Sequence, residues 1–231
     1  MESKHKLSEV ISIVSHQFKT PLSAIKGYLE VLLNQDLGKI NLKQKEYLED
    51  AMENTVRMIA LVKDLLDVSQ IEQGKLDFKV NLSDLEKIIK GVIKDFSSFF
   101  KAKNCEVFFK ALNKIPLINI DSLKIEQVIY NLISNAIRYS GTKGKVEITL
   151  EKKEGNVCFC CKDNGIGVPK EDKKKIFTKF YRSEKAITFS TGGSGLGLFI
   201  SKAIIKKSKG RIWFKSKENE GSIFCFSLPI N

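Results

Sequence analysis

The stretch "SHQFKTPLSAIKGYLEVLL" (residues 15–33) sets the fold of the N-terminal part of the chain. Its apolar residues recur every three or four positions and continue a pattern that begins upstream, as in one long amphipathic helix. His16 and Thr20 stand one helical turn apart, hence on one face, and Pro21 follows them. Because proline cannot donate to the helix ladder and crowds the carbonyl four residues back, we expect a local bend beside the histidine.

A second helical pattern follows after a polar connection. The connecting stretch "NQDLGKINL" (34–42) contains a glycine, and apolar side chains recur at helical spacing again over residues 48–66. Two antiparallel helices cannot bury such wide apolar stripes against each other alone, so two copies are expected to associate into a four-helix bundle. The sequence therefore predicts a homodimer formed through a helical hairpin that spans residues 1–74.

The periodicity changes from about Lys75 onward. The stretch "LDFKVNL" (76–82) alternates like a strand, and Ser83 and Glu86 have the spacing of a capping box for a helix that reaches about Lys103. Further helices are predicted over residues 122–139 and 195–208, and short strands over residues 106–110, 117–120, 146–151, 157–162, 211–215 and 222–228. This mixture indicates a second domain, residues 75–231, of the α+β class, with helices on one face of a mixed sheet. The stretch "QGKL" (73–76) is the expected hinge.

The composition is that of a globular protein. The 231 residues are 42% hydrophobic and 29% charged, which argues against disorder. The net charge of +12 is compatible with nucleic acid, an anionic membrane surface, a phosphorylated ligand or an acidic protein partner. Because the lysines are spread along the chain rather than gathered into an arm, nucleic acid is disfavoured. No apolar run approaches the roughly 20 residues that cross a bilayer, so no membrane segment is expected. The five cysteines are expected to be free thiols in a reducing cytoplasm rather than metal ligands or disulfides.

One predicted helix, "IEQVIYNLISNAIRYS" (125–140), carries a polar stripe opposite its apolar one. Asn131, Asn135 and Arg138 lie on this stripe, about one turn apart. Asparagine is a poor helix former, so two of them on one stripe weaken the helix without an evident structural return. Their side-chain oxygens are hard ligands that suit Mg²⁺. The stripe is therefore a candidate metal and phosphate site, and a merely solvated face is the alternative.

Two glycine-containing segments follow. "CKDNGIGVP" (161–169) places Asp163 directly after a strand, where its carboxylate could accept a hydrogen bond from the exocyclic amine of adenine; a plain turn is the alternative. "GGSGLGLFISKAI" (192–204) offers free backbone amides at a helix N-terminus, which suit phosphate, although it matches neither the Walker loop nor the dinucleotide fingerprint. The charged stretch between them, residues 170–191, has a length that suits a mobile lid over a nucleotide.

These segments, in this order, resemble the ATP-binding domain of sensor histidine kinases, whose superfamily includes gyrase, the Hsp90 chaperones and the mismatch-repair ATPases. "NLISNAIRYS" resembles the asparagine box, "DNGIGV" and "GGSGLGL" the two glycine boxes, and "IFTKFYRS" the phenylalanine box. "SHQFKTPLSAIKGYLEVLL" resembles the phosphoacceptor box of the dimerisation and histidine-phosphotransfer domain. The resemblance covers nearly the whole chain and implies a dimeric four-helix bundle followed by an α/β sandwich that binds ATP.

The resemblance also implies residue roles. The implied nucleotide site consists of Asn131, Asn135, Arg138, Tyr139, Asp163, Gly165, Gly167, Gly193, Gly195 and Gly197. Within it Asn135 would hold Mg²⁺, Arg138 would meet phosphate in place of the usual lysine, and Tyr139 would pack on the base or ribose. His16 would take the γ-phosphoryl group of ATP and pass it to an aspartate of a response-regulator receiver domain. Thr20 stands where the family has a polar residue implicated in dephosphorylating that partner.

Gln17 departs from the family pattern, which commonly has Glu or Asp after the phosphoacceptor. A glutamine can orient the imidazole but cannot take its proton, so autophosphorylation is expected to be slow or to release the proton to water. A nucleotide-binding regulatory module with weak or no autophosphorylation is therefore the alternative. A gyrase- or chaperone-like ATPase would need a carboxylate such as Glu126 to activate water, and it leaves the His16 helix unexplained. The chain is expected in the cytoplasm, including as the cytoplasmic part of a membrane-bound sensor.

Overall fold

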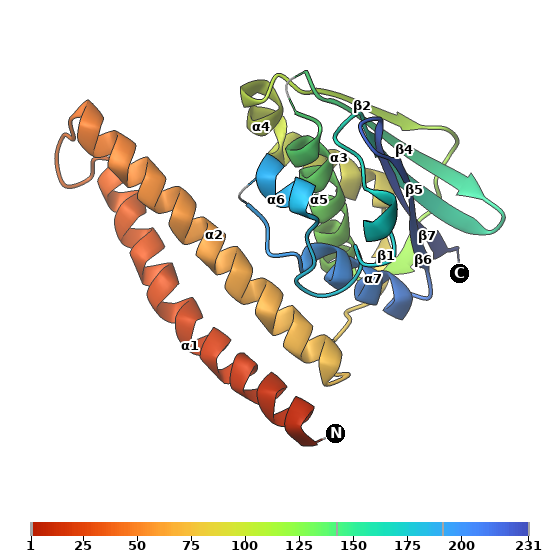
Figure 1. The fold of residues 1–231 in the computed structure, drawn as a ribbon, viewed down its shortest axis with the longest axis horizontal. Coiled ribbons are helices and arrows are strands. Elements are labelled where there is room, and N and C mark those ends of the chain that lie inside the picture. The colour runs from red at the N-terminus through yellow and green to blue at the C-terminus, as the bar shows by residue number, and fades with distance from the viewer. Residues whose placement is uncertain (1, 142, 191, 231) are drawn as a thin grey trace. The chain divides into compact units, whose positions relative to one another are not determined.

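The computed structural model describes residues 2–141, 143–190 and 192–230, and the side chains of all of these except residues 2–12 and 16. Two compact units are present, Met1–Leu76 and Asp77–Asn231. The first unit holds α1 (Glu2–Leu33) and α2 (Leu42–Glu72) (Figure 1). The second unit holds, in chain order, β1 (Asn81–Ser83), α3 (Leu85–Asp95), α4 (Ser97–Ala102), β2 (Glu106–Ala111), β3 (Ile118–Ile120), α5 (Ser122–Tyr139), β4 (Lys145–Lys153), β5 (Asn156–Asp163), the 3-10 turn η1 (Lys170–Asp172), α6 (Glu184–Phe189), α7 (Gly197–Lys207), β6 (Arg211–Lys217) and β7 (Gly221–Pro229).

The first unit confirms the predicted helical hairpin. α2 begins at a capping box in which the Asn41 side chain accepts from Gln44 N at 2.8 Å and the Gln44 side chain accepts from Asn41 N at 2.9 Å. α1 runs through Pro21 without a break. None of the helices in the described part of the chain has the length and apolar character needed to span a bilayer.

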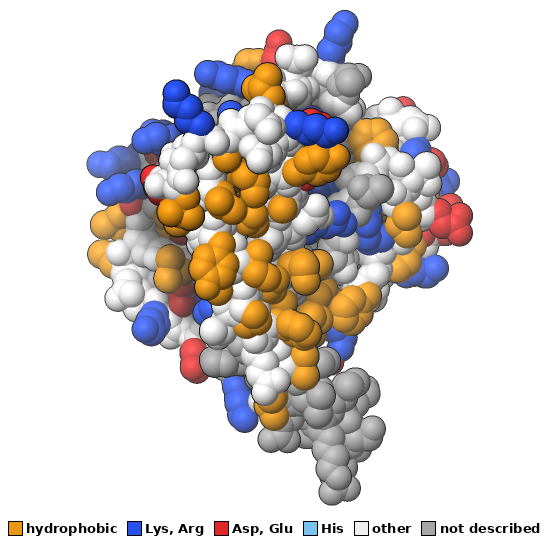
Figure 2. Space-filling model, turned by 90° about the vertical axis from the view of Figure 1, so that its left-hand side faces the viewer, with side chains coloured by type: hydrophobic (Ala, Val, Ile, Leu, Met, Phe, Trp, Pro, Cys, Tyr) orange, Lys and Arg blue, Asp and Glu red, His pale blue; other side chains and the backbone are white. Residues whose placement is uncertain are grey.

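The hairpin leaves much apolar surface exposed. Large exposed apolar side chains are Ile13, Val14, Phe18, Ile25, Tyr28 and Val31 on α1, and Leu42, Tyr47, Val56 and Met58 on α2. Figure 2 shows hydrophobic side chains gathered in a band along the helical hairpin. A single hairpin therefore does not bury its own apolar stripe, as its amphipathic pattern predicts.

The second unit confirms the predicted mixed sheet. Five strands follow the order β2-β4-β5-β7-β6, with β2 and β4 parallel and the other neighbours antiparallel. β1 and β3 form a separate antiparallel pair. α5 packs on β4 and β5, and α7 packs on β6 and β7, so the helices cover one face of the sheet (Figure 1).

The core lies between this sheet and α5. The Asp121 side chain caps α5 by accepting from Lys124 N at 3.0 Å. The apolar stripe predicted for this helix is buried, namely Ile125, Val128, Ile129, Leu132, Ile133, Ala136 and Ile137. Strand β5 alternates, and its buried residues include Phe159, whose ring stacks on Phe226 of β7 with centroids 4.9 Å apart. This packing fixes the polar stripe of α5 on the opposite side of the helix.

Several predicted element boundaries are wrong. Asp84 rather than Ser83 caps α3, accepting from Lys87 N at 3.0 Å, because Ser83 belongs to the short strand β1. The helix predicted to reach Lys103 is interrupted at Phe96, whose ring packs against Tyr130 of α5 with centroids 4.5 Å apart. The strand predicted over residues 76–82 shortens to Asn81–Ser83, and α7 begins at Gly197 rather than at residue 195.

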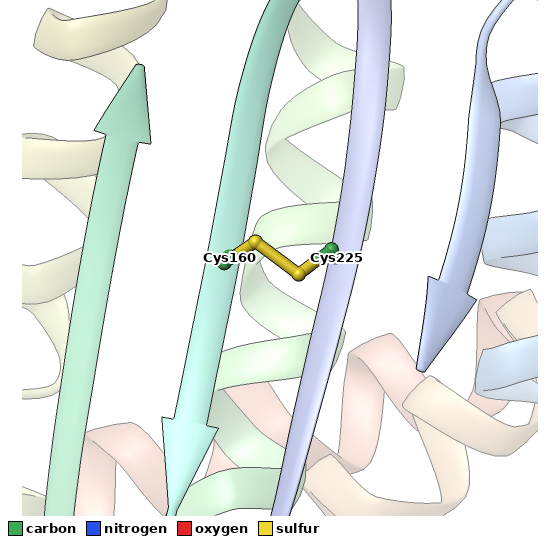
Figure 3. The surroundings of a disulfide bond; sticks show 2 residues. All are labelled: Cys160 and Cys225. Atoms are coloured by element: carbon green, nitrogen blue, oxygen red, sulfur yellow. A yellow bond between two sulfur atoms is a disulfide. The ribbon is translucent and has the colours of Figure 1, made fainter. Parts of the chain in front are cut away.

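The expectation that all five cysteines are free thiols is also wrong. Cys160 and Cys225 form a disulfide between β5 and β7 (Figure 3). They are separated by 65 residues in the sequence but lie directly opposite each other in the strand register. Cys105, Cys158 and Cys161 remain free. Strand pairing, which brings distant residues together, is the physical reason for the difference.

Candidate functional site

A chain of polar side chains joins α5 to α7. Asn135 donates from Nδ2 to Asn131 Oδ1 at 3.3 Å, and Asn131 donates from its own Nδ2 to Ser201 Oγ at 2.9 Å. These two bonds fix which way the Asn135 amide faces, and its Oδ1 accepts no hydrogen bond from a described residue. No group of three or more His, Cys, Asp or Glu side chains is placed to hold a metal among the described residues. Asn135 Oδ1 is therefore the hard oxygen ligand that this surface offers to a cation such as Mg²⁺.

The second glycine segment lies against the same polar stripe. A Cβ atom at Gly197 would overlap the Asn131 amide, with Asn131 Cγ only 2.8 Å away. A Cβ atom at Gly193 would lie 2.7 Å from Nη1 of Arg138. The lack of side chains at these two glycines therefore lets the segment before α7 approach the predicted metal and phosphate side of α5.

Asp163 ends strand β5 and is buried, with 5% of its surface exposed. The alternation of β5 turns it toward the helix-covered side, like Phe159. Its Oδ1 accepts hydrogen bonds from Gly165 N at 2.9 Å and from Ser222 N at 3.2 Å. Burial raises the pKa of this carboxyl to about 6, and the two backbone bonds oppose the rise. Oδ2 accepts from none of the described residues, so it is available to an N–H donor.

The loop after Asp163 is held between two other segments. A Cβ atom at Gly165 would overlap the carbonyl of Tyr139 at the end of α5, and Ile166 N donates to that carbonyl at 3.1 Å. Gly167 has a left-handed φ of 65°, and a Cβ atom there would overlap the carbonyl of Lys217. The first glycine segment is therefore packed between the C-terminus of α5 and the turn that connects β6 to β7.

The segment predicted to be a lid, residues 170–191, contacts the second glycine segment. Arg182 donates from its guanidinium group to the carbonyls of Ala186 at 2.9 Å, Gly193 at 3.4 Å and Ser190. A Cβ atom at Gly195 would lie 2.7 Å from the backbone carbon of Phe180. The ring of Tyr139 lies 6.5 Å from that of Phe189, measured between centroids. The phenylalanine box and the glycine segment thus form one structural unit beside the end of α5.

The predicted phosphoacceptor lies in the first unit. The backbone of His16 belongs to α1, but its side chain lies outside the described residues. Gln17 and Thr20 are exposed on the same helix.

The structure adds three residues that the sequence reasoning missed. Ser201 orients Asn131, Ser222 binds Asp163, and Arg182 donates hydrogen bonds to backbone carbonyls of the lid segment. Ser201 had a signal, because it is a hydroxyl one turn after Gly197 on an otherwise apolar helix face. Ser222 acts through its backbone, so its residue type carried no signal.

Known proteins match the chain in both units. Residues 6–74 match the family model "His Kinase A (phospho-acceptor) domain". Residues 120–231 match "Histidine kinase-, DNA gyrase B-, and HSP90-like ATPase". Sensor histidine kinase WalK of Bacillus subtilis (strain 168) is 34% identical over 228 residues, which cover 96% of this chain and 36% of WalK. The chain therefore spans little more than a third of that relative.

Solved structures of histidine kinases are also similar to the chain. The histidine kinase AdeS of Acinetobacter baumannii is 28% identical with a TM-score of 0.65, and the match covers 94% of this chain and 98% of AdeS. The histidine kinase ThkA, solved in complex with the response regulator protein TrrA, is 25% identical with a TM-score of 0.65. That match covers all of this chain and 64% of the ThkA chain. The two family matches identify the chain as a histidine kinase catalytic core, a phosphoacceptor domain followed by a domain of the histidine kinase, gyrase B and HSP90 ATPase type.

Proposed function

We propose that this chain is the catalytic core of an ATP-dependent protein-histidine kinase, which transfers the γ-phosphoryl group of ATP to His16. The observation that carries the proposal is the bonded series Asn135–Asn131–Ser201, which leaves Asn135 Oδ1 free on a surface lined by backbone of the second glycine segment. A merely solvated helix face would not need buried Ser201 to orient its asparagines.

Asp163 would recognise the adenine base. Its Oδ2 would accept a hydrogen bond from the exocyclic amine, which guanine lacks at that edge. Gly165 would form the adjoining wall, because its missing side chain lets the loop press on Tyr139. The Tyr139 ring would pack on the base or ribose.

The phosphates would lie between α5 and the second glycine segment. Asn135 Oδ1 fits Mg²⁺, which needs few protein ligands where phosphates and water supply the others. Bound Mg²⁺ would neutralise phosphate charge during transfer. Arg138, beside Gly193, would meet a phosphate oxygen, and backbone amides around Gly193, Gly195 and Gly197 would meet others.

Transfer to His16 would proceed in line. The unprotonated imidazole nitrogen would form a bond to the γ-phosphorus as the bond to the bridging oxygen breaks and ADP leaves. The ring would then lose its remaining N–H proton. Gln17 can accept a hydrogen bond from this N–H but cannot take the proton, so the proton would pass to water. At neutral pH an ordinary imidazole is largely unprotonated and ready to attack.

The phosphoryl group would then pass to an aspartate of a response-regulator receiver domain. The solved complex of ThkA with a response regulator and the net charge of +12 support an acidic receiver as the partner. Thr20, exposed on α1 one turn after His16, would serve the reverse reaction, dephosphorylation of that partner.

Residues 1–74 would serve as the phosphotransfer and dimerisation domain and residues 75–231 as the ATP-binding domain. The exposed apolar side chains of the hairpin support a homodimer in which two hairpins form a four-helix bundle. The full protein would work in the cytoplasm, with this chain as the cytoplasmic part of a membrane-bound sensor or as a free protein.

Incubation with γ-labelled ATP and Mg²⁺ tests the proposal. We expect protein-bound label that is lost in acid, survives alkali and disappears in His16→Ala. A regulatory module without autophosphorylation, which Gln17 favours, would bind ATP and retain no label. Release of labelled phosphate without any protein-bound label would instead indicate a gyrase-like ATPase.

A further inference from the structure

The disulfide between Cys160 and Cys225 joins β5 to β7 on the side of the sheet away from α5 (Figure 3). The two residues are direct partners in the antiparallel register, and their Cα atoms are 4.1 Å apart. Strand pairing continues on both sides of this position. We therefore expect the two cysteines to stay near each other in the reduced form, so that the disulfide can break and re-form within the folded sheet.

The same two strands carry a residue of the candidate nucleotide site three positions further along. Asp163 ends β5, and its direct partner in β7 is Ser222. Ser222 N donates to Asp163 Oδ1 at 3.2 Å. The disulfide thus cross-links β5 and β7, the two strands whose last pair contains Asp163, the residue assigned to adenine.

We propose that Cys160 and Cys225 form a reversible thiol–disulfide switch that sets nucleotide affinity, with the disulfide form binding more tightly. The inference rests on the proposed function, which assigns the Asp163 carboxylate to adenine. In a reducing cytoplasm, disulfides are usually transient or redox-sensing rather than structural.

The switch needs an oxidant and a reductant of the low-molecular-weight thiol class, such as glutathione. In oxidation, the two cysteine thiols give two electrons and two protons to oxidised glutathione. One S–S bond forms between Cys160 and Cys225, the S–S bond of the oxidant breaks, and two glutathione thiols are released. Reduction is the reverse reaction.

The direction of the effect follows from local opening of the sheet. Reduction removes a covalent restraint, so the end of the β5–β7 ladder opens more often and releases Asp163 from Ser222 N. A nucleotide that binds to the reduced form must first order this end of the ladder. The free energy needed for this ordering is subtracted from the binding free energy, so the affinity is lower.

Cys158 provides a matched control. It lies on β5 two residues before Cys160, hence on the same face, and its partner in β7 is Ser227. It is a free, half-buried thiol, and burial raises its pKa, which makes it a poor nucleophile near neutral pH. Cys158→Ser should therefore leave the redox response intact.

The test compares ADP binding to the complete chain in reduced and in oxidised glutathione buffers. Calorimetry gives the affinity, mass spectrometry counts the thiols, and circular dichroism verifies that each variant is folded. We expect the Kd for ADP to be roughly fivefold higher after reduction. Cys160→Ser and Cys225→Ser should bind like the reduced protein in both buffers, whereas Cys158→Ser should respond like the unmodified chain.

Thermodynamic linkage supplies a second readout that needs no substitution. If the disulfide raises ADP affinity, ADP must shift the glutathione equilibrium of the Cys160–Cys225 pair toward the disulfide by the same factor. Equal ADP affinity in the two redox states, or failure of this pair to oxidise, would overturn the switch while leaving the kinase proposal standing. Failure to bind ADP in either state would refute the kinase proposal and the switch together.

Discussion

Asn131 on α5 and Ser201 on α7 are joined by a hydrogen bond of 2.9 Å from the side-chain amide to the hydroxyl group. Ser201 is only 2% exposed, so water cannot easily replace this bond. The bond links the helix that carries the asparagine box to the helix that follows the second glycine box. It also orients Asn131 so that its oxygen faces Asn135.

Ser201→Ala should therefore lower both stability and nucleotide affinity. The Asn131 amide would lose its buried acceptor, which costs about 1–3 kcal/mol of unfolding free energy. Urea unfolding and ADP titration would measure the two effects. Ser208→Ala on the same segment is the control, because Ser208 Oγ is buried without a partner in the described structure and its removal should be neutral or stabilising. Equal effects of the two substitutions would show that the bond to Asn131 has no special role.

Gly197→Ala should impair binding of the magnesium nucleotide although alanine is the better helix former. The new methyl group would overlap the Asn131 amide and displace the Asn135 side chain with it. We expect the Kd for Mg²⁺–ADP to rise by roughly tenfold or more, which corresponds to about 1.4 kcal/mol. Gly192→Ala is the control, because the nearest atom to its new Cβ would be Ser190 Oγ at 3.9 Å. Loss of binding in both variants would indicate that the segment tolerates no side chain, irrespective of Asn131.

Nucleotide binding should weaken as the pH falls through about 6, the pKa to which burial raises Asp163. Only the ionised carboxylate accepts freely at Oδ2, so the apparent Kd for ADP should rise by up to about tenfold per pH unit below 6. Calorimetric titrations between pH 5 and pH 8, in steps of about half a unit, would trace this dependence. Asp163→Asn should bind weakly with a flat profile, and a pH-dependent Asn variant would assign the titration to another group.

Asp163→Asn should stabilise the fold at neutral pH, although it weakens nucleotide binding. The folded-state pKa of Asp163 exceeds the ordinary value of 3.8, so the folded protein binds more protons between pH 3.8 and about 6. The contribution of this residue to stability is therefore present at low pH and lost as the pH rises through about 6. Asp163→Asn should therefore be more stable than the unmodified chain at neutral pH. A lower stability of this variant at neutral pH would contradict the proposal that the carboxylate is retained for nucleotide binding at a cost to folding.

Gln17→Glu should accelerate autophosphorylation. A carboxylate next to His16 can take the imidazole proton, and a general base contributes typically about 10²–10⁴-fold. We expect at least about a tenfold higher initial rate of label incorporation at neutral pH. Gln17→Ala should be no faster than the unmodified chain, because it removes the amide without supplying a base. A Glu variant that is also no faster would show that proton transfer does not limit the reaction.

The local part of the nucleotide site could be predicted from the sequence. The apolar stripe of α5 fixes which side of that helix is polar, so Asn131 and Asn135 had to share a face. Likewise, the alternation of β5 turns Asp163 to the buried side, which explains why a charged residue ends a strand next to the core. Both results depend on periodicity within one element.

Pairing between distant segments could not be predicted in the same way. The Cys160–Cys225 disulfide depends on the register of two strands separated in the chain by 65 residues. The bonds from Arg182 to the carbonyls of Ala186 and Gly193 depend on how an irregular segment folds back on itself. Neither property leaves a periodic signal, because a register or a loop path is set by tertiary packing.

Histidine kinase activity is tested most directly by locating the phosphoryl group after incubation with ATP and Mg²⁺. Mass spectrometry of peptides prepared at neutral or alkaline pH preserves a phosphorus–nitrogen bond that acid would destroy. We predict phosphate on His16 in the unmodified chain and much less of it in Asp163→Asn, which retains His16 and loses the adenine contact. Phosphate on a serine or threonine, or ATP turnover with His16 unmodified, would contradict the proposed histidine kinase activity.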